Sequence, residues 1–224
     1  MLHIVYNIFM KKILESLLDL IYRKKCYFCG SSKLSLKMCP SCYEKLDLCE
    51  KNASRVIEGV DIYCAGFYTK ELQKLIRGLK YHGQRDLAYY QAQFMYDYFK
   101  QIENFKDKTF DLVPVPLHQK RLKKRKYNHM ELVCDEFAKI TGYECNYSLI
   151  KRIKDTKPQY KLSRKERLEN LSDAFEVNKD AISGNTILLM DDICTTGVTF
   201  EEMIKVLKQS GVENIVCFAT ATPV

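Results

Sequence analysis

The segment Ile187-Leu-Leu-Met-Asp-Asp-Ile-Cys-Thr-Thr-Gly-Val-Thr199 decides the fold of this chain. It opens with an apolar run, continues with the adjacent carboxylates Asp191 and Asp192, and then enters a hydroxyl-rich turn that holds one glycine. Beyond the turn, apolar side chains recur at helical spacing, at Phe200, Met203, Ile204 and Leu207. The segment therefore predicts a buried strand, a loop and a helix.

Asp191 and Asp192 directly follow the predicted strand, at the position where open α/β sheets bind ligands. Their oxygens can accept hydrogen bonds from sugar hydroxyls. The loop that follows leads into a helix N-terminus, whose unpaired N–H groups favour a phosphate. An ordinary turn with a capping Asp or Thr is the alternative, but it does not explain two consecutive acids after an apolar run. We expect a site for a phosphorylated sugar.

This pattern resembles the phosphoribosyl pyrophosphate (PRPP) motif of type I phosphoribosyltransferases. The resemblance implies that Asp191 and Asp192 hold the 2′- and 3′-hydroxyls of the ribose and act in catalysis. It also implies that PRPP binds together with Mg²⁺. The loop that would cradle the 5′-phosphate consists of Thr195, Thr196, Gly197, Val198 and Thr199.

Two further segments complete the resemblance. Phe110-Asp-Leu-Val-Pro-Val-Pro-Leu-His118 predicts a strand that two alternating prolines end, because neither proline can donate to a ladder. The turn corresponds to the pyrophosphate loop of phosphoribosyltransferases, which implies contacts from Val115 and Pro116. Residues 151–170 occupy the place of the hood that closes over PRPP. The hood's candidates for pyrophosphate, each equally explained as a solvated charge, are Arg152, Lys157, Arg164 and Arg167.

Two cysteine pairs, Cys26-x-x-Cys29 and Cys39-x-x-Cys42, precede this region. Four thiolates at this spacing can converge tetrahedrally on Zn²⁺ and leave no open position for a substrate, so we expect a structural zinc site. A redox pair or chance spacing is the alternative, and Cys49 is a weaker candidate ligand. A domain this small needs the metal because it cannot bury enough apolar surface to fold alone.

The expected organisation has three parts. Residues 1–24 form an amphipathic helical N-terminus, residues 25–52 a zinc-binding domain with four cysteine ligands, and residues 53–224 a phosphoribosyltransferase-like domain. In the last domain strands alternate with helices, which indicates a mainly parallel α/β sheet flanked by helices. Besides those already named, we expect strands at 62–68, 143–150, 174–177 and 215–219, and helices around 72–79, 86–101 and 128–140.

Charge is concentrated in two places. The chain carries 36 basic and 28 acidic side chains, for a net charge of +8. Residues 118–129 and residues 151–167 each carry a net charge of +6, so the remainder is acidic. A polyanionic substrate or a nucleic-acid backbone would each explain these two positive segments. Tyr127 and Tyr160 lie within them and can stack on the bases of single-stranded DNA.

Several classes of protein are disfavoured. The sequence has no Walker A loop, no Gly-x-Gly dinucleotide fingerprint, no Gly-x-Ser-x-Gly and no His-Glu-x-x-His. No apolar segment reaches transmembrane length without a charge, and the ten cysteines are clustered instead of spread through loops. We therefore expect a cytoplasmic protein, whose translation starts at either Met1 or Met10.

The wider pattern resembles the ComF proteins of bacterial natural competence, of the ComFC type. The shared segments are Leu79-Lys80-Tyr81-x-Gly83-x-Arg85, Val113-Pro-Val-Pro-Leu-His118 and Thr156-x-Pro158-Gln159. The resemblance implies PRPP binding and a role in uptake of single-stranded DNA beside a helicase-like partner. An active phosphoribosyltransferase that acts on a nitrogen base is the alternative. The family commonly has Arg-Gly-Phe-Asn where this chain has Arg125-Lys126-Tyr127-Asn128, which removes the residue that adopts positive φ freely.

Overall fold

The computed structural model describes residues 25–32, 36–106, 108–156 and 163–223. The helix expected within residues 8–21 lies outside them. The chain divides into two compact units, residues 1–45 and 46–224. This division falls earlier than the expected boundary after residue 52, because the connecting residues pair with the second unit. Leu48 forms an antiparallel bridge with Gly66, and the Cys49 N–H donates to the Ala65 carbonyl at 2.8 Å.

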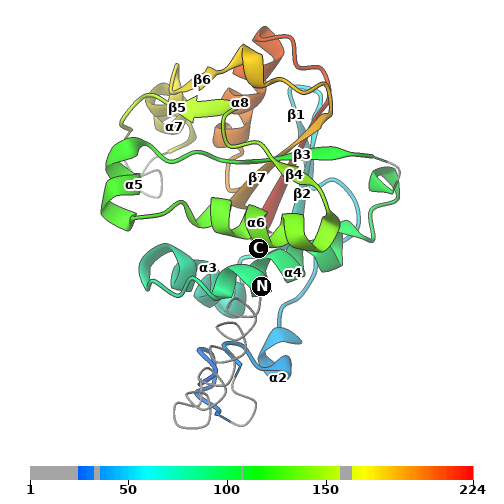
Figure 1. The fold of residues 1–224 in the computed structure, drawn as a ribbon, viewed down its shortest axis with the longest axis vertical. Helices are drawn as coiled ribbons and strands as arrows, with labels where there is room; N and C mark the ends of the chain where they lie inside the picture. Colours follow the sequence, from blue (N-terminus) through cyan, green and yellow to red (C-terminus); the bar gives the residue numbers. More distant parts are fainter. Residues whose placement is uncertain (1–24, 33–35, 107, 157–162, 224) are drawn as a thin grey trace, which may run out of the picture. The chain divides into compact units, whose positions relative to one another are not determined.

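The second unit is built on a six-stranded sheet with the order β1-β2-β8-β7-β3-β4 (Figure 1). β1 is antiparallel to β2, and all other neighbours are parallel. The predicted class, a mainly parallel α/β sheet flanked by helices, is therefore confirmed. The strands are β1 (Arg55–Ile57), β2 (Val60–Phe67), β3 (Phe110–Pro114), β4 (Glu144–Cys145), β7 (Thr186–Ile193) and β8 (Ile215–Thr222).

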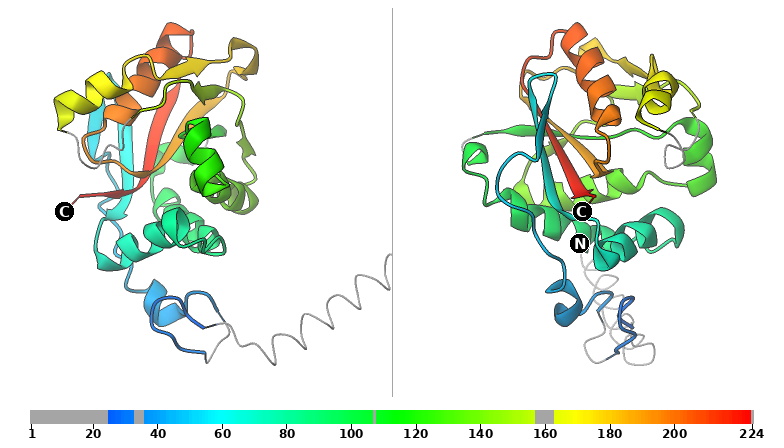
Figure 2. Two further views of the ribbon diagram at one scale, coloured as in Figure 1. Left: turned by 90° about the vertical axis from the view of Figure 1, so that its left-hand side faces the viewer. Right: turned by 180° about the vertical axis from the view of Figure 1, so that it is seen from behind.

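Helices cover the sheet on both sides (Figure 2). The periodic segments of the sequence form α3, α4, α6 and α8, as predicted. Over the described residues, no helix has the length and apolar character that a membrane span requires. The helices of this unit are α3 (Lys70–Tyr81), α4 (Leu87–Phe99), α5 (Gln119–Arg125), α6 (His129–Thr141), α7 (Arg164–Leu171) and α8 (Val198–Gln209), with short 3-10 turns at Glu103–Phe105 and Lys179–Ala181.

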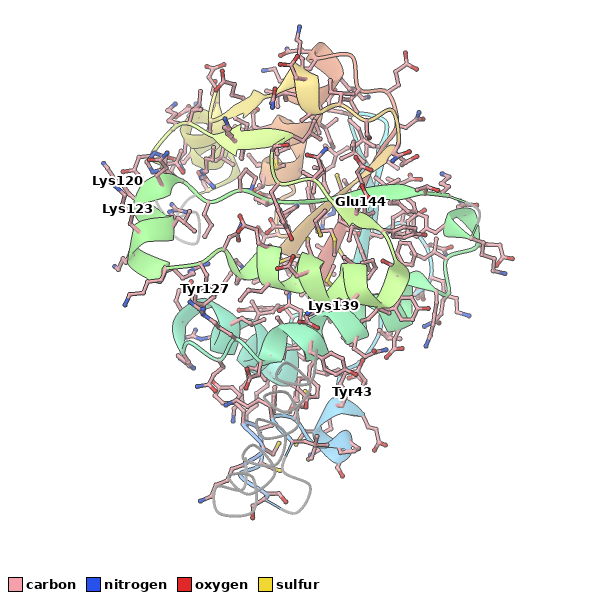
Figure 3. The ribbon with its side chains drawn as sticks, in the orientation of Figure 1. Tyr43, Lys120, Lys123, Tyr127, Lys139 and Glu144 are labelled. Carbon is pink, nitrogen blue, oxygen red and sulfur yellow. The ribbon has the colours of Figure 1, made fainter. Side chains whose placement is uncertain are left out.

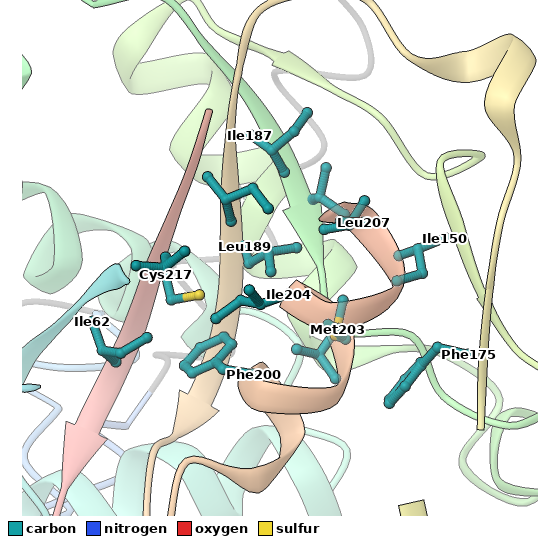
Figure 4. Close-up of a cluster of buried hydrophobic side chains, with 14 of the residues drawn as sticks. Ile62, Ile150, Phe175, Ile187, Leu189, Phe200, Met203, Ile204, Leu207 and Cys217 are labelled. Carbon is teal, nitrogen blue, oxygen red and sulfur yellow. The ribbon is translucent and has the colours of Figure 1, made fainter. Parts of the chain in front are cut away.

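One face of the sheet packs against α8 (Figure 4). Side chains alternate along a strand, so the odd-numbered residues of β7 and β8 share this face. Ile187, Leu189 and Cys217 are buried there together with the apolar stripe of α8. Fully burying an aliphatic or aromatic side chain of this size contributes about 1.5–3 kcal/mol, so this layer holds the strand-loop-helix segment in place.

The opposite face packs against α4 and α6 and is rich in aromatic rings. Phe218 of β8 lies 5.9 Å from the Tyr98 ring of α4 and 6.3 Å from the Phe137 ring of α6. Phe110 of β3 lies 5.7 Å from Phe99, edge to face, whereas the Phe218 and Tyr98 rings are stacked. The sheet is therefore buried on both sides, which fits the continuous apolar runs of its parallel strands.

The single strand expected over residues 143–150 is wrong. β4 ends at Cys145, and the next strand, β5 (Ile150–Arg152), pairs antiparallel with β6 (Phe175–Val177) in a separate two-stranded sheet. Asn146 separates the two strands. Its N–H donates to the Leu112 carbonyl at 2.9 Å, and its side chain donates to the Ala181 carbonyl at 2.8 Å. The first bond is the last of the β3–β4 pairing, and the second joins Asn146 to the 3-10 turn at Lys179–Ala181, outside the main sheet.

Both ends of the segment 151–170, which was expected to occupy the place of the hood, form regular secondary structure. Arg152 lies in β5 and is buried, and α7 begins at Arg164. Ser163 and Glu166 form a capping box at the start of α7, with Ser163 accepting from the Glu166 N–H. The Ser-x-x-Glu spacing is visible in the sequence and could have predicted this helix.

Lys126 adopts the positive φ that the sequence disfavours. Its φ is 68° and it ends α5, with its N–H donating to the Leu122 carbonyl at 2.6 Å. Lys126 therefore adopts the left-handed backbone conformation that glycine adopts without strain. A left-handed residue other than glycine costs roughly 1 kcal/mol.

We expect Lys126→Gly to raise the free energy of unfolding by up to about 1 kcal/mol, because it removes this strain. For a chain of this size the melting temperature should rise by about 2–4 °C in a thermal unfolding scan. Lys126→Ala removes the same charge but keeps the Cβ, so it should give no increase. Equal effects of both variants would show that charge, and not backbone strain, is responsible.

Candidate functional site

The candidate site lies at the edge of the main sheet where the parallel strands end. The Val115 N–H extends the pairing of β3 by donating to the Met190 carbonyl at 2.9 Å. This bond brings the turn at Val115 and Pro116 beside the end of β7, where Asp191 and Asp192 stand. The two segments that the sequence analysis singled out thus meet at one edge.

Asp191 and Asp192 point to opposite faces of the sheet because they are neighbours in a strand. Asp191 has the parity of Leu189 and lies on the α8 face. Asp192 has the parity of Met190 and lies on the face covered by α4 and α6. The adjacent acids therefore meet different surroundings.

Asp192 is buried and held by two donors. Lys80 of α3 places its Nζ 2.5 Å from Asp192 Oδ2, and His129 Nε2 contacts the same oxygen. Burial alone would raise the pKa of Asp192, but the charge of Lys80 and the contact with His129 hold it well below its usual range. Asp192 is therefore a carboxylate at neutral pH.

His129 is connected to Arg125. It is the first residue of α6, and Arg125 Nη1 lies 2.9 Å from its Nδ1. Burial lowers the pKa of His129 despite the neighbouring carboxylate of Asp192, so the ring is neutral at pH 7. Because arginine only donates, Nδ1 accepts from Arg125 and Nε2–H donates to Asp192.

Asp191 differs from Asp192 in its hydrogen bonds and in its pKa. Its Oδ1 accepts the backbone N–H of Asp192 at 2.8 Å. Burial and the charge of Asp192 raise the pKa of Asp191 to about 7, against the opposing influence of Lys80. The site therefore combines one permanent carboxylate with one that titrates near neutrality.

Two arginines, Arg152 of β5 and Arg121 of α5, share Thr156. Arg152 Nη2 donates to the Thr156 hydroxyl, and Arg121 Nη2 donates to the Thr156 carbonyl at 2.7 Å. The buried Nε of Arg152 has no hydrogen-bond partner in the part of the chain that the structure describes. Burial and the charge of Arg121 lower the pKa of Arg152 to about 10. Two crowded cations of this kind favour an anionic ligand.

The loop after β7 leads into α8 through Gly197. Gly197 has a φ of 81° and precedes the first residue of α8. A Cβ there would lie 2.3 Å from Ile57 Cδ1, so the position requires glycine for both conformation and space. Arg55 of β1 fixes the loop from outside by donating to the Thr195 carbonyl at 2.9 Å. Val198 is buried, while Thr196 and Thr199 are half-buried.

The structure does not describe the side chains of three residues that were predicted to contact pyrophosphate. Lys157 lies outside the described residues. The backbones of Arg164 and Arg167 belong to α7, but their side chains are outside the description, so their contact with pyrophosphate stays a prediction. Sequence reasoning assigned no role at this site to Lys80, His129, Arg121 or Arg55. Lys80 does lie in a segment that carries the family resemblance, and this resemblance is a usable signal.

The four predicted zinc ligands lie together in the first unit. The thiol sulfurs of Cys26, Cys29, Cys39 and Cys42 are all within 4.8 Å of one another. Cys29 Sγ and Cys39 Sγ are 3.7 Å apart, and a tetrahedral site with zinc–sulfur bonds of ~2.3 Å has edges of about 3.8 Å. The distance between the Cys29 and Cys39 sulfurs therefore matches that expected for two ligands of one zinc ion.

Backbone amides support thiolate ligands at this cluster. The Cys39 N–H donates to Cys26 Sγ at 3.4 Å, across a turn formed by the start of α2 (Pro40–Tyr43). Burial opposes ionisation of Cys26, but N–H groups of Cys29, Cys39 and Phe28 lower its pKa to about 6. Cys49 lies in the other unit and is not part of the cluster.

α5 carries the first basic segment. Lys120 and Lys123 lie on its outer side (Figure 3). Lys120 Nζ pairs with Asp155 at 2.8 Å, whereas Lys123 and Lys124 are exposed. Tyr127 is half-buried, because its hydroxyl donates to the Leu79 carbonyl at 2.5 Å and Arg85 lies 4.5 Å from its ring. Tyr160 is outside the described residues.

The chain is similar in sequence to two competence proteins and to a DNA utilization protein. Competence protein F of Haemophilus influenzae is 30% identical over 154 residues, which are 67% of this chain and 67% of that protein. Competence protein ComFC of Bacillus subtilis is 26% identical over 204 residues, 84% of this chain and 79% of its own. DNA utilization protein YhgH of Salmonella typhi is 31% identical over 104 residues, 46% of this chain and 45% of its own.

No protein-family model matches the chain. Among solved structures, a hypoxanthine phosphoribosyltransferase from Staphylococcus aureus is similar with a TM-score of 0.31 and 15% identity, over 66% of this chain and 61% of its own.

The cysteine cluster predicts one zinc ion per chain. We expect Cys39→Ser to lose most of the bound zinc, since three remaining thiolates form an incomplete site. Metal content of the purified variants by mass spectrometry is the measurement. Cys49→Ser is the matched control and should retain zinc in full. Full retention by Cys39→Ser would remove Cys39 from the ligand set.

Proposed function

Since the chain belongs to the ComF family of competence proteins, we propose that it binds PRPP at the end of β7 and acts in uptake of single-stranded DNA during natural transformation. The observation that carries PRPP binding is the twin-acid, glycine-loop arrangement at one sheet edge. Asp191 and Asp192 lie near the carboxyl end of β7, and Gly197 is the N-cap of the helix that follows, α8.

The ribose would bind between the two acids and the loop. Asp191 and Asp192 have oxygens suited to accepting the 2′- and 3′-hydroxyls. The 5′-phosphate would then lie over residues 195–199, at the N-terminus of α8, where the positive end of the helix dipole favours an anion. Both groups belong to one rigid strand-loop-helix segment, so their spacing is fixed before the ligand arrives.

Pyrophosphate would bind on the β5 side of Asp191. The buried Arg152, whose Nε has no hydrogen-bond partner among the described residues, and the neighbouring Arg121 supply positive charge there. Val115 and Pro116 supply the turn on the other side. Mg²⁺ would accompany the pyrophosphate, and carboxylates such as Asp191 offer the oxygen ligands it prefers.

Transfer of the phosphoribosyl group to a nitrogen base is the alternative function of the same site. The arginines would then stabilise the pyrophosphate as it leaves C1, and catalysis would come from charge stabilisation and orientation. Asp191, Asp192 and Arg152 are the proposed catalytic residues, and no covalent nucleophile is required. Pyrophosphate release with a panel of bases separates the two functions, because a pure binding protein releases none.

The role in DNA uptake is supported by the relatives and by α5. Two relatives are named competence proteins, and a third is named a DNA utilization protein. Lys123 and Lys124 are exposed on α5 and belong to a segment without acids. Lysines of this kind attract a phosphate backbone. The expected helicase-like partner remains part of this proposal.

PRPP with Mg²⁺ should stabilise the protein against heat. At 100 times the dissociation constant, a ligand adds about 2.7 kcal/mol, which corresponds to roughly 5–10 °C in melting temperature. We expect the Asp191→Ala, Asp192→Ala double variant to lose this shift. Asp61→Ala, at the amino end of β2, is the control that should keep it. An unchanged shift in a folded double variant would contradict the assignment of the site.

Single-stranded DNA should bind with a strong dependence on salt. In gel-shift titrations, neutralising two phosphate contacts should flatten the slope of log affinity against log salt by about 1.4. We expect this from Lys123→Gln with Lys124→Gln. Lys139→Gln, on α6 and paired with Glu136 at 2.7 Å, should leave the slope unchanged. A flat slope for the wild type would exclude binding through the phosphate backbone.

A further inference from the structure

Asp192 is the end of a chain of contacts that begins at the protein surface. Arg125, at the end of α5, contacts His129 Nδ1 at 2.9 Å, and His129 Nε2 contacts Asp192 Oδ2. Lys80 Nζ approaches that same oxygen at 2.5 Å. Residues of α3 and α6 therefore contact one carboxylate oxygen directly, and α5 reaches it through His129.

This arrangement leaves the second oxygen of Asp192 available. In the described part of the chain, no residue donates a hydrogen bond to Asp192 Oδ1, whereas Oδ2 has two donors. A carboxylate with one oxygen held on two sides cannot rotate freely. Oδ1 is then presented in one direction only, as the acceptor for a ligand hydroxyl.

Arg125 determines which ring nitrogen of His129 carries the proton. Its guanidinium only donates, so Nδ1 must accept and the proton must be on Nε2, facing Asp192. Among the described residues Arg125 forms no ion pair with an acid. Instead it lies 5.6 Å from the ring of the exposed Tyr81, which holds the guanidinium without competing for its hydrogen bonds.

We propose that Arg125, His129 and Lys80 are positioning residues for the ribose site, with Arg125 acting on Asp192 only through the tautomer of His129. This inference rests on the proposed binding of PRPP. It assigns a role to Arg125 that differs from direct contact with a phosphate or with DNA, which its basic surroundings on α5 would otherwise suggest.

A double-mutant cycle distinguishes the relay from direct contact. We expect Arg125→Gln to weaken PRPP binding about tenfold, the equivalent of one charge-assisted hydrogen bond. In the His129→Leu background both ring nitrogens are absent, so Arg125 has no acceptor through which it could act on Asp192. There, Arg125→Gln should have no further effect. Isothermal titration with PRPP and Mg²⁺ measures all four affinities.

Matched variants complete the design. Arg125→Lys keeps a donor for Nδ1 and should restore most of the affinity. Lys139→Gln removes an exposed charge from α6, the helix that carries His129, and should leave the affinity for PRPP unchanged. Equal weakening by Arg125→Gln in both backgrounds would indicate direct contact and overturn the relay. So would an unchanged affinity in the folded single variant.

The tautomer of His129 can be read without any ligand. In ¹⁵N spectra of histidine-labelled wild-type protein, His129 should be neutral with its proton on Nε2, and the missing signal of His129→Leu identifies it among the four histidines. A proton on Nδ1, or a charged ring at pH 7, would overturn the relay even if Arg125→Gln failed to fold. If the wild type bound no PRPP, the proposed function would fail while this spectrum still tested the relay.

Discussion

The structure depends on two neighbouring carboxylates at the end of one buried strand. Placing Asp191 and Asp192 side by side is electrostatically unfavourable, since each charge raises the cost of the other. Strand geometry separates them onto opposite faces, and Lys80 neutralises Asp192 at 2.5 Å. Removing one partner of such a buried pair typically costs about 3–5 kcal/mol of stability. The contacts of α3 and α6 with Asp192 therefore stabilise the site as well as the fold.

The same separation divides the chemistry of the site. On the α4 and α6 side, Asp192 remains ionised and fixed. On the α8 side, Asp191 titrates near neutrality and faces the region of Arg152. The glycine loop then follows without interruption, since Gly197 allows the sharp entry into α8 that a Cβ would block at Ile57. At this one edge of the sheet, carboxylates are available for a sugar diol, the loop before α8 for a phosphate, and arginines for a pyrophosphate.

Much of this could be predicted from local sequence, and the failures have a physical pattern. The strand-loop-helix segment and the four cysteines are short-range patterns, and both were located correctly. Lys80 and His129 could not be connected to Asp192, because only tertiary packing brings them together. The break between β4 and β5 depends on hydrogen bonds of Asn146 to distant carbonyls. Lys126 adopts a positive φ although it is not a glycine, so residue preference alone does not predict the conformation of that turn.

The most direct test of the central claim is the pH dependence of PRPP affinity, compared between the wild type and Asp191→Asn by titration calorimetry. Asp191 has its pKa raised to about 7, so it is protonated below neutrality and ionised above. If its carboxylate accepts the ribose, wild-type affinity should rise between pH 6 and pH 8, beyond any change in the ligand itself. Asp191→Asn should bind PRPP with only the ligand's own dependence. Identical pH profiles for the two proteins would contradict the account.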